Sequence, residues 1–382
     1  MDFRKLTEYL DSLEKVGVPC CDLAVWQDHR CIYRHHAGWR DAARTVPADG
    51  REVYRLYSTS KVILAVSVMR LKEAGLLQLD DPLEKYLPAF RNMKVMEGDR
   101  IVPAKTPVTI RNLLAMQGGF DYDMDTPEMR ERFPKATPEN GMDLMMEAMA
   151  ARPLHFHPGK GYMYSLCHDV LGAVVAKVSG MRLSEYYKKN IFDPLEMPTI
   201  SFEMTDDKRS RLADLFVYDG NSHTSAPLPR SEMDAIMEDV LLKIGVESAG
   251  GGLIGDVDDY IRFADALAND GVGFNGYRLI SCASIDEMRV DHLTDLNRAD
   301  FVNFSGYPEY GYGLGVRTLI DESRSRSPLG EFGWNGAAGA WTMIDTDHRL
   351  SAFYAQHIME CGYCYAVIHP TIRDLIYACM EA

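Results

Sequence analysis

Strand-forming segments cluster at the two ends of this chain, and this distribution restricts the fold more than any other feature of the sequence. Near the N-terminus, two apolar runs at Cys20–Gln27 and Arg30–Gly38 flank an Asp28-His29 turn. Late in the chain, further strand patterns follow at 311–320, 331–334, 340–345 and 350–357. The connections at 320–331 and 345–350 are too short for crossover helices, so these strands are expected to pair antiparallel. The chain is therefore predicted to close one mainly antiparallel sheet from both of its ends.

Helical patterns broken by Pro and Gly dominate the middle of the chain. An amphipathic helix at 2–16 precedes the first strand, and a helix at 366–380 ends the chain, so helices from both ends would flank the sheet. We expect an α/β (α+β) fold. Residues 1–82 and 240–382 would form a discontinuous sheet domain, residues 83–239 a mainly helical inserted region, and the active site would lie at their interface.

Composition excludes several classes of function. The 382 residues are 46% hydrophobic and 25% charged, as in ordinary globular proteins. A formal net charge of −15 argues against a nucleic-acid partner and against binding to an anionic membrane. No apolar run reaches transmembrane length, and the first residues lack the apolar core of a signal peptide. We therefore expect a cytoplasmic protein, unless a leader has been removed. A homo-oligomer is left open.

One glycine motif invites a cofactor interpretation that the residues after it contradict. Gly250, Gly252 and Gly255 have the G-x-G-x-x-G spacing of dinucleotide-binding loops. No βαβ context precedes them, and the acidic residues Asp256 and Asp259 at the following helix start would repel a pyrophosphate. We expect a tightly packed glycine turn followed by a helix with an acidic cap, and no cofactor.

The chemistry is predicted to centre on Ser58 and Lys61. An extended apolar segment gives way at Ser58 to a helix, and the three-residue spacing puts both side chains on one helical face. A buried lysine can accept the proton of a serine hydroxyl, and the free N–H groups of a helix start favour developing negative charge. By itself the motif also fits a serine that caps a helix and a solvated lysine. A second match, Ser12-Leu-Glu-Lys15, lies in an exposed amphipathic helix and is expected to be inert.

An ordered set of motifs carries a family resemblance. The set comprises Tyr57-Ser58-Thr59-Ser60-Lys61, Leu79-Asp80-Asp81-Pro82, Thr109-Ile110-Arg111-Asn112-Leu113-Leu114, Pro158-Gly159-Lys160, Tyr164-Ser165-Leu166, Gly250-Gly251-Gly252-Leu253, Tyr312-Gly313-Leu314-Gly315 and Gly333-Trp334-Asn335-Gly336. Together, from about residue 15 to 360, they resemble the serine β-lactamase-like family, also called the penicillin-recognising or β-lactamase-related serine hydrolases. The resemblance implies a β-lactamase/transpeptidase-like fold and an acyl-enzyme on Ser58.

The resemblance implies a catalytic role for Tyr164, whose phenol would relay a proton to the leaving group. The family usually has an Asn two residues after this tyrosine, where it helps to hold the lysine and an amide substrate. Here that residue is Leu166. This departure weakens the case for β-lactam hydrolysis. Leu166 and Gln117 are nevertheless assigned to the substrate-binding set.

The third family element, a Lys or His two residues before a Gly, is represented here by Trp334-Asn335-Gly336. Trp334 brings no cation for a substrate carboxylate, only an aromatic wall with one N–H donor. Gly336 would let the backbone approach the acyl group, and the N–H groups of Ala337 and Ser58 would form the oxyanion hole. These features resemble the class C-like, family VIII carboxylesterase branch. We assign Trp334, Asn335 and Gly336 to substrate binding.

The predicted activity is ester hydrolysis by Ser58 as nucleophile, Lys61 as base and Tyr164 as proton relay, with a small-molecule ester or amide as substrate. Neither a metal nor an organic cofactor is needed for this chemistry. Alternatives are a D-amino-acid peptidase or weak β-lactamase, a transacylase, and a catalytically quiet scaffold. The physiological substrate and its acyl and alcohol groups do not follow from the sequence.

Overall fold

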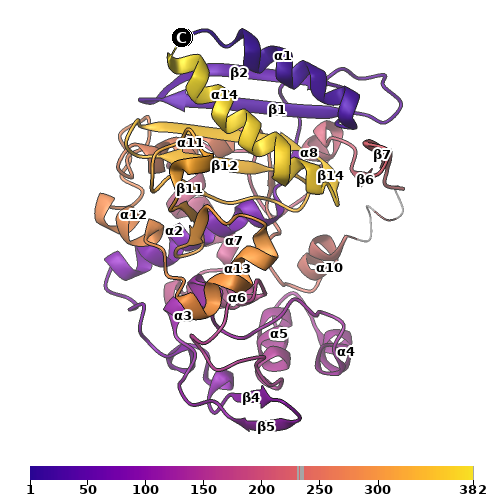
Figure 1. Cartoon of the computed structure of the whole chain (residues 1–382). Coiled ribbons are helices and arrows are strands. Elements are labelled where there is room, and N and C mark those ends of the chain that lie inside the picture. Colours follow the sequence, from indigo (N-terminus) through magenta and orange to yellow (C-terminus); the bar gives the residue numbers. More distant parts are fainter. Residues whose placement is uncertain (230–231, 233–235, 382) are drawn as a thin grey trace.

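The computed structural model describes residues 1–229, 232 and 236–381 and contains a seven-stranded antiparallel sheet (Figure 1). Its strand order is β2-β1-β13-β12-β11-β10-β9. The strands are β1 (Cys20–Gln27), β2 (Arg30–Gly38), β9 (Tyr310–Tyr312), β10 (Arg317–Leu319), β11 (Phe332–Gly333), β12 (Trp341–Asp345) and β13 (Leu350–Gln356). β1 pairs with β13, with Leu23 opposite Tyr354, so the two ends of the chain do close one sheet.

Helices cover both faces of this sheet (Figure 1). Since side chains alternate across a strand, Leu23 packs in the apolar cluster of α1 (Arg4–Ser12) and α14 (His369–Glu381). Its neighbour Ala24 belongs to the opposite cluster, which includes α11 (Val257–Ala268). There the ring of Tyr260 on α11 stacks on Phe353 of β13 with centroids 4.0 Å apart. The helices from the two chain ends thus bury one face of the central strands, and α11, from within the chain, buries the other.

The C-terminal strands differ in detail from the prediction. The single strand predicted at 311–320 is wrong, because β9 and β10 are separate strands joined by a turn. In that turn Gly315 has φ of +83°, and the Gly313 N–H donates to the Val316 carbonyl at 2.8 Å. A residue with φ near +80° lies in the left-handed region and turns the chain out of an extended strand. The last helix also begins with a π-helical turn, Cys364–Ile368, ahead of α14.

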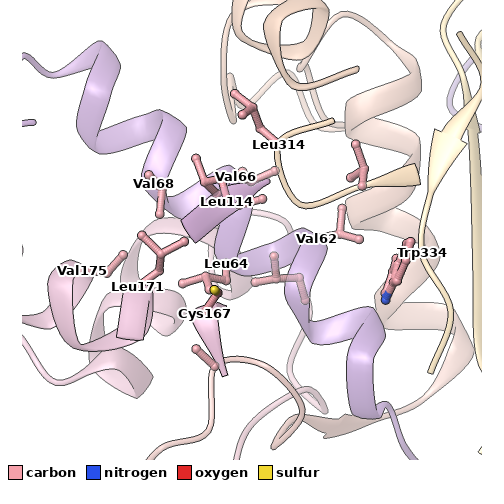
Figure 2. Packing of buried hydrophobic residues seen from close by; sticks show 14 of the residues in the cluster. Val62, Leu64, Val66, Val68, Leu114, Cys167, Leu171, Val175, Leu314 and Trp334 are labelled. Carbon is pink, nitrogen blue, oxygen red and sulfur yellow. The ribbon is translucent and has the colours of Figure 1, made fainter. Parts of the chain in front are cut away.

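Helix α2 (Ser60–Glu73) crosses the centre of the molecule and is apolar on almost every side (Figure 2). Val62, Leu64 and Val68 are fully buried, and the helix packs on α6 (Cys167–Ser179) through residues such as Leu171. A helix buried all round is the usual centre of a large core. Burial of each large aliphatic side chain contributes about 1.5–3 kcal/mol, so the helix that begins next to Ser58 is firmly held.

The middle of the chain is rich in short helices, with two small hairpins. Its elements are α3 (Ile110–Leu114), α4 (Pro127–Arg132), α5 (Gly141–Ala150), α6, α7 (Leu183–Tyr187), α8 (Asp206–Arg211), α10 (Met237–Lys243), β4 (Lys94–Glu97), β5 (Arg100–Pro103), β6 (Phe216–Asp219) and β7 (Thr224–Pro227). After it come α12 (Cys282–Arg289), α13 (Asp295–Ser305) and β14 (Ile358–Met359), which pairs with β6. The division of the chain at residues 83 and 240 stays a prediction.

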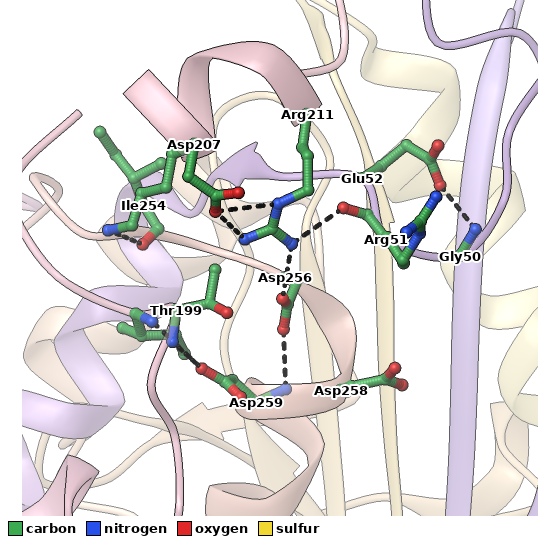
Figure 3. A network of polar contacts seen from close by, with 12 residues as sticks. Gly50, Arg51, Glu52, Thr199, Asp207, Arg211, Ile254, Asp256, Asp258 and Asp259 are labelled. Atoms are coloured by element: carbon green, nitrogen blue, oxygen red, sulfur yellow. Dashed lines mark hydrogen bonds and ion pairs between the residues drawn. The ribbon is translucent and has the colours of Figure 1, made fainter. Parts of the chain in front are cut away.

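The glycine turn at 250–255 leads into α11 as predicted. Asp256 caps this helix by accepting a hydrogen bond from the Asp259 N–H at 3.0 Å (Figure 3). Arg211 on α8 bridges Asp256 at 3.4 Å and Asp207 at 2.7 Å. The predicted acidic cap is therefore confirmed, and its ion pair with Arg211 links α8 to α11.

Among the described residues, no helix has both the length and the apolarity needed to cross a membrane.

Candidate active site

Ser58 lies in a short 3₁₀ turn, Tyr57–Thr59, immediately before α2. The chain enters this turn from β3 (Tyr54–Arg55), which pairs with β8 (Ile254–Gly255). Tyr57 has φ of +44°, an uncommon backbone conformation for a bulky residue. Such strain persists only where the surroundings impose it, and it occurs often at active sites. The regular helix begins at Ser60, two residues later than the sequence pattern indicated.

Lys61 is fully buried and its side-chain nitrogen contacts three oxygens. Its Nζ lies 3.1 Å from Ser58 Oγ, 2.7 Å from the Tyr122 hydroxyl and 2.6 Å from the Gly250 carbonyl oxygen. The three-residue spacing therefore does bring the serine and the lysine into hydrogen-bond contact. The distance is suitable for proton transfer between them.

Tyr164 packs beside this pair, with Lys61 Nζ 4.7 Å from the centroid of its ring. Its hydroxyl accepts a hydrogen bond from Trp334 Nε1 at 2.9 Å, and its ring stacks on Phe304 at 4.5 Å. Within the described part of the chain, no hydrogen bond joins the Tyr164 hydroxyl to Ser58 or Lys61. The structure thus brings Ser58, Lys61, Tyr164 and Trp334 together, with the phenol of Tyr164 directed toward the indole.

Tyr122 is a site residue that sequence reasoning missed. It lies in the loop between α3 and α4, and the sequence around it has no spacing that would relate it to Ser58. One side of the residue reaches solvent, but the hydroxyl end lies in the site against Lys61. Burial, together with the nearby Tyr164 and Asp169, raises the pKa of Tyr122 well above its ordinary value. Its phenol therefore stays protonated over the working range of most enzymes.

Asp169 on α6 was also missed, although it begins the apolar helix predicted at 169–179. Its side chain is 1% exposed and accepts hydrogen bonds from Ser248 Oγ at 2.7 Å and from the Gly250 N–H at 3.2 Å. Burial raises the pKa of Asp169, and the charge of Lys61 opposes this rise. A Cβ at Gly250 would lie 2.6 Å from Asp169 Oδ2, so any larger residue there would displace the carboxyl group. Asp169 and Gly250 together form a cradle for Lys61.

The turn formed by residues 335–339 follows β11 and lies against the backbone that enters Ser58. A Cβ on Gly336 would come within 2.4 Å of the Leu56 carbonyl oxygen. Ala337 lines the cavity, and its N–H makes no hydrogen bond to any other described residue. A free backbone donor beside a nucleophile is what an oxyanion site requires.

A cavity of about 530 Å³ opens above Ser58. Its wall includes the carboxyl-bearing Asp169 and seven aromatic residues, which are Tyr57, Tyr122, Tyr164, Phe304, Tyr307, Trp334 and Tyr365. No Arg, Lys or His side chain is among the described residues that line it. Asn335 is in the wall, but its amide is occupied, since Nδ2 donates to the Tyr307 hydroxyl and Oδ1 accepts from Arg317.

Two residues of the predicted substrate-binding set, Leu166 and Gln117, are not among those that line the cavity. Leu166 precedes α6 and turns its side chain into the core, where it is 5% exposed. Gln117 is 9% exposed and donates from Nε2 to the His292 carbonyl oxygen at 3.0 Å. The first packs as a core residue, and the second links two loops.

Comparisons with known proteins agree with this architecture. Residues 5–360 match the Beta-lactamase family. Protein Rv1367c of Mycobacterium tuberculosis is 29% identical over 347 residues, covering 86% of this chain and 83% of the relative. Esterase EstB of Burkholderia gladioli is 27% identical over 368 residues, covering 91% and 88%. The solved structure of EstCE1, a hydrolase with promiscuous acyltransferase activity, superposes with a TM-score of 0.80 at 22% identity and covers 98% of each chain. The fold is thus the α/β fold of β-lactamases and transpeptidases, with an antiparallel sheet and a helical insert.

Proposed function

The chain belongs to the β-lactamase family, and from this premise we propose that it is a serine hydrolase that cleaves carboxylic esters through an acyl-enzyme on Ser58. The observation that carries the proposal is the 3.1 Å contact between Ser58 Oγ and the buried Lys61 Nζ beneath an aromatic cavity. A nucleophile and a base within hydrogen-bond reach are the signature of nucleophilic catalysis.

In the proposed mechanism, Lys61 takes the proton of Ser58 while Oγ attacks the ester carbonyl carbon. The N–H groups of Ser58 and Ala337 bind the oxyanion of the tetrahedral intermediate. The proton passes through Tyr164 to the departing alcohol as the ester C–O bond breaks. Water then attacks the acyl-enzyme, gives its proton back to Ser58 through the same groups, and releases the carboxylic acid.

The nature of the cavity wall supports neutral esters over β-lactams and peptides. Penicillins and peptide C-termini carry a carboxylate, which needs a cation or several donors. Trp334 stands where the family often has a cation, and its N–H already donates to Tyr164. The described cavity wall has no Arg, Lys or His to replace it. Amide hydrolysis is therefore the weaker alternative.

Acyl transfer is a second candidate function, favoured by the size of the cavity. Its aromatic wall can hold an acceptor alcohol in place of water, and EstCE1 is described as a hydrolase with promiscuous acyltransferase activity. The ratio of ester product to free acid, measured with increasing alcohol, would separate the two activities.

The test of the proposal uses Ser58→Ala. This variant should lose turnover of p-nitrophenyl acetate and labelling by a fluorophosphonate, while wild type shows both. Nitrocefin, assayed in parallel, should be turned over far more slowly than the ester. Retention of ester turnover by Ser58→Ala would refute the assignment of the nucleophile.

A further inference from the structure

The turn that carries Ala337 is held from behind by the C-terminal segment of the chain. The Tyr365 hydroxyl lies 2.8 Å from the Ala337 carbonyl oxygen and 3.0 Å from that of Gly336. The Ile358 N–H donates to the Ala338 carbonyl oxygen at 3.0 Å, and His369 Nε2 lies 3.1 Å from that of Gly339. Four successive carbonyls of the turn therefore have partners between residues 358 and 369.

The Tyr365 hydroxyl has one proton, which it shares between the two carbonyl oxygens in a three-centre hydrogen bond. The contact with Gly336 is the important one, because of the chemistry of the peptide group. The carbonyl of Gly336 and the N–H of Ala337 belong to the same peptide unit. A hydrogen bond donated to that carbonyl polarises the unit and strengthens its N–H as a donor. It also fixes the plane of the peptide, and with it the direction in which the N–H points.

The position of Tyr365 is itself secured. The residue lies in the π-helical turn Cys364–Ile368, a rare conformation that is frequent at functional sites. Its carbonyl oxygen accepts a hydrogen bond from the Tyr307 hydroxyl at 3.2 Å. Burial raises the pKa of the Tyr365 hydroxyl above its ordinary value, so this group stays a donor.

We propose that Tyr365 is a positioning residue of the hydrolytic reaction, which orients and polarises the Gly336–Ala337 peptide so that the Ala337 N–H stabilises the oxyanion. The inference rests on the proposed function, because it requires an oxyanion formed at Ser58. Tyr365 acts through the peptide, although its ring also forms part of the cavity wall.

The experiment compares Tyr365→Phe with Tyr377→Phe. Tyr377 lies on the following helix α14 and donates a buried hydrogen bond to Asp345 at 2.7 Å, so the control loses a comparable bond away from the turn. Four quantities are measured for each protein. They are kcat and KM for p-nitrophenyl butyrate, the inhibition constant of a trifluoromethyl ketone, which forms a tetrahedral oxyanion on the serine, and the Kd of an unreactive ether analogue of the substrate.

Tyr365→Phe should lower kcat about 10-fold with KM nearly unchanged, a part of the 10²–10³ that an entire oxyanion donor supplies. The trifluoromethyl ketone should bind about 10-fold more weakly, while the ether binds as to wild type. Tyr377→Phe should leave all four constants within about twofold of wild type. If Tyr365→Phe does not fold, Tyr307→Phe is measured in the same way and should give a smaller loss of the same kind.

An unchanged kcat and ketone affinity in Tyr365→Phe would overturn the inference and leave the proposed function intact. Equal losses for the ketone and the ether would also overturn it, because they would indicate direct substrate contact. If wild type shows no ester turnover that depends on Ser58, the proposed function fails and the inference fails with it.

Discussion

Two phenols flank Lys61, and substitution of each by phenylalanine should separate their roles in catalysis. The Tyr122 hydroxyl lies 2.7 Å from Lys61 Nζ, whereas the Tyr164 hydroxyl accepts its hydrogen bond from Trp334 at 2.9 Å. We predict that Tyr122 holds the amine in place for the attack by Ser58, and that Tyr164 carries the proton to the leaving alcohol.

The two losses differ in size. Tyr122→Phe removes one hydrogen bond to the amine that acts as base, and a bond between uncharged groups contributes about 0.5–1.5 kcal/mol, or about 2- to 12-fold in rate. Tyr164→Phe removes a general acid, which contributes about 10²- to 10⁴-fold. It also leaves the buried Trp334 N–H without its partner. For an alkyl ester, Tyr164→Phe should therefore be the more damaging change.

The assay is steady-state hydrolysis of two esters that share an acyl group. p-Nitrophenolate leaves without a proton, whereas an alkoxide needs one. Tyr164→Phe should slow the alkyl ester at least 10-fold more than the p-nitrophenyl ester, and Tyr122→Phe should slow both equally. The reasoning is refuted if the dependence on the leaving group appears in Tyr122→Phe and is absent from Tyr164→Phe. Tyr277→Phe, whose hydroxyl bonds to the Asn190 carbonyl far from Ser58, is the control for loss of a phenol.

Two further predictions concern backbone space and acid stability. Gly250→Ala should reduce kcat by more than about 100-fold while the protein stays folded, because its Cβ would lie 2.6 Å from Asp169 Oδ2 and 3.3 Å from Lys61 Nζ. Ester turnover and a thermal melt check this, and near-normal turnover would show that the cradle is not needed. Burial lowers the pKa of His168 and His369 to about 3 and that of His357 to about 4, from 6.5. Groups with depressed native pKa values stay neutral in the folded protein and bind protons on unfolding, so each of these histidines should cost about 2 kcal/mol of stability at pH 5. Burial raises the pKa of Asp22 and Asp259 to about 7, and these two carboxyls oppose the loss over the same pH range. The histidine contribution is therefore measured by difference: between pH 7.5 and 5, His357→Gln should lose about 2 kcal/mol less than wild type in urea unfolding, and an equal loss would contradict the prediction.

The sequence allowed the sheet to be predicted because its evidence is local. Alternating apolar runs mark β1 and β2, and short connections leave only antiparallel pairing for the C-terminal strands. The ends of the strands were harder to predict where they depend on the backbone conformation of a glycine. The turn at Gly315, for example, divides one predicted strand into two. Periodicity alone cannot give the φ angle of a single residue.

The residues of the candidate site also differ in whether local sequence patterns could predict them. Ser58 and Lys61 could be paired from the sequence because one helical turn brings them together. Tyr122, Asp169 and Tyr365 could not, since each reaches the site through the packing of elements far apart in the chain. No local spacing encodes these contacts. Leu166 and Gln117 do not line the cavity, and their sequence positions gave no sign of this. The side chain of Leu166 is buried in the core, and that of Gln117 donates to a carbonyl in another loop.

The pairing of β1 with β13 has a consequence for synthesis of the protein. β1 leaves the ribosome early, but its inner partner follows on the order of 300 residues later, which at about 5–20 residues per second means a wait of roughly 15–60 seconds. During that interval the nascent hairpin presents an open hydrogen-bonding edge, the kind of surface that chaperones shield and that aggregation exploits. The site around Ser58 is also incomplete during that interval, because the turn that holds Ala337 is translated only near the end of the chain.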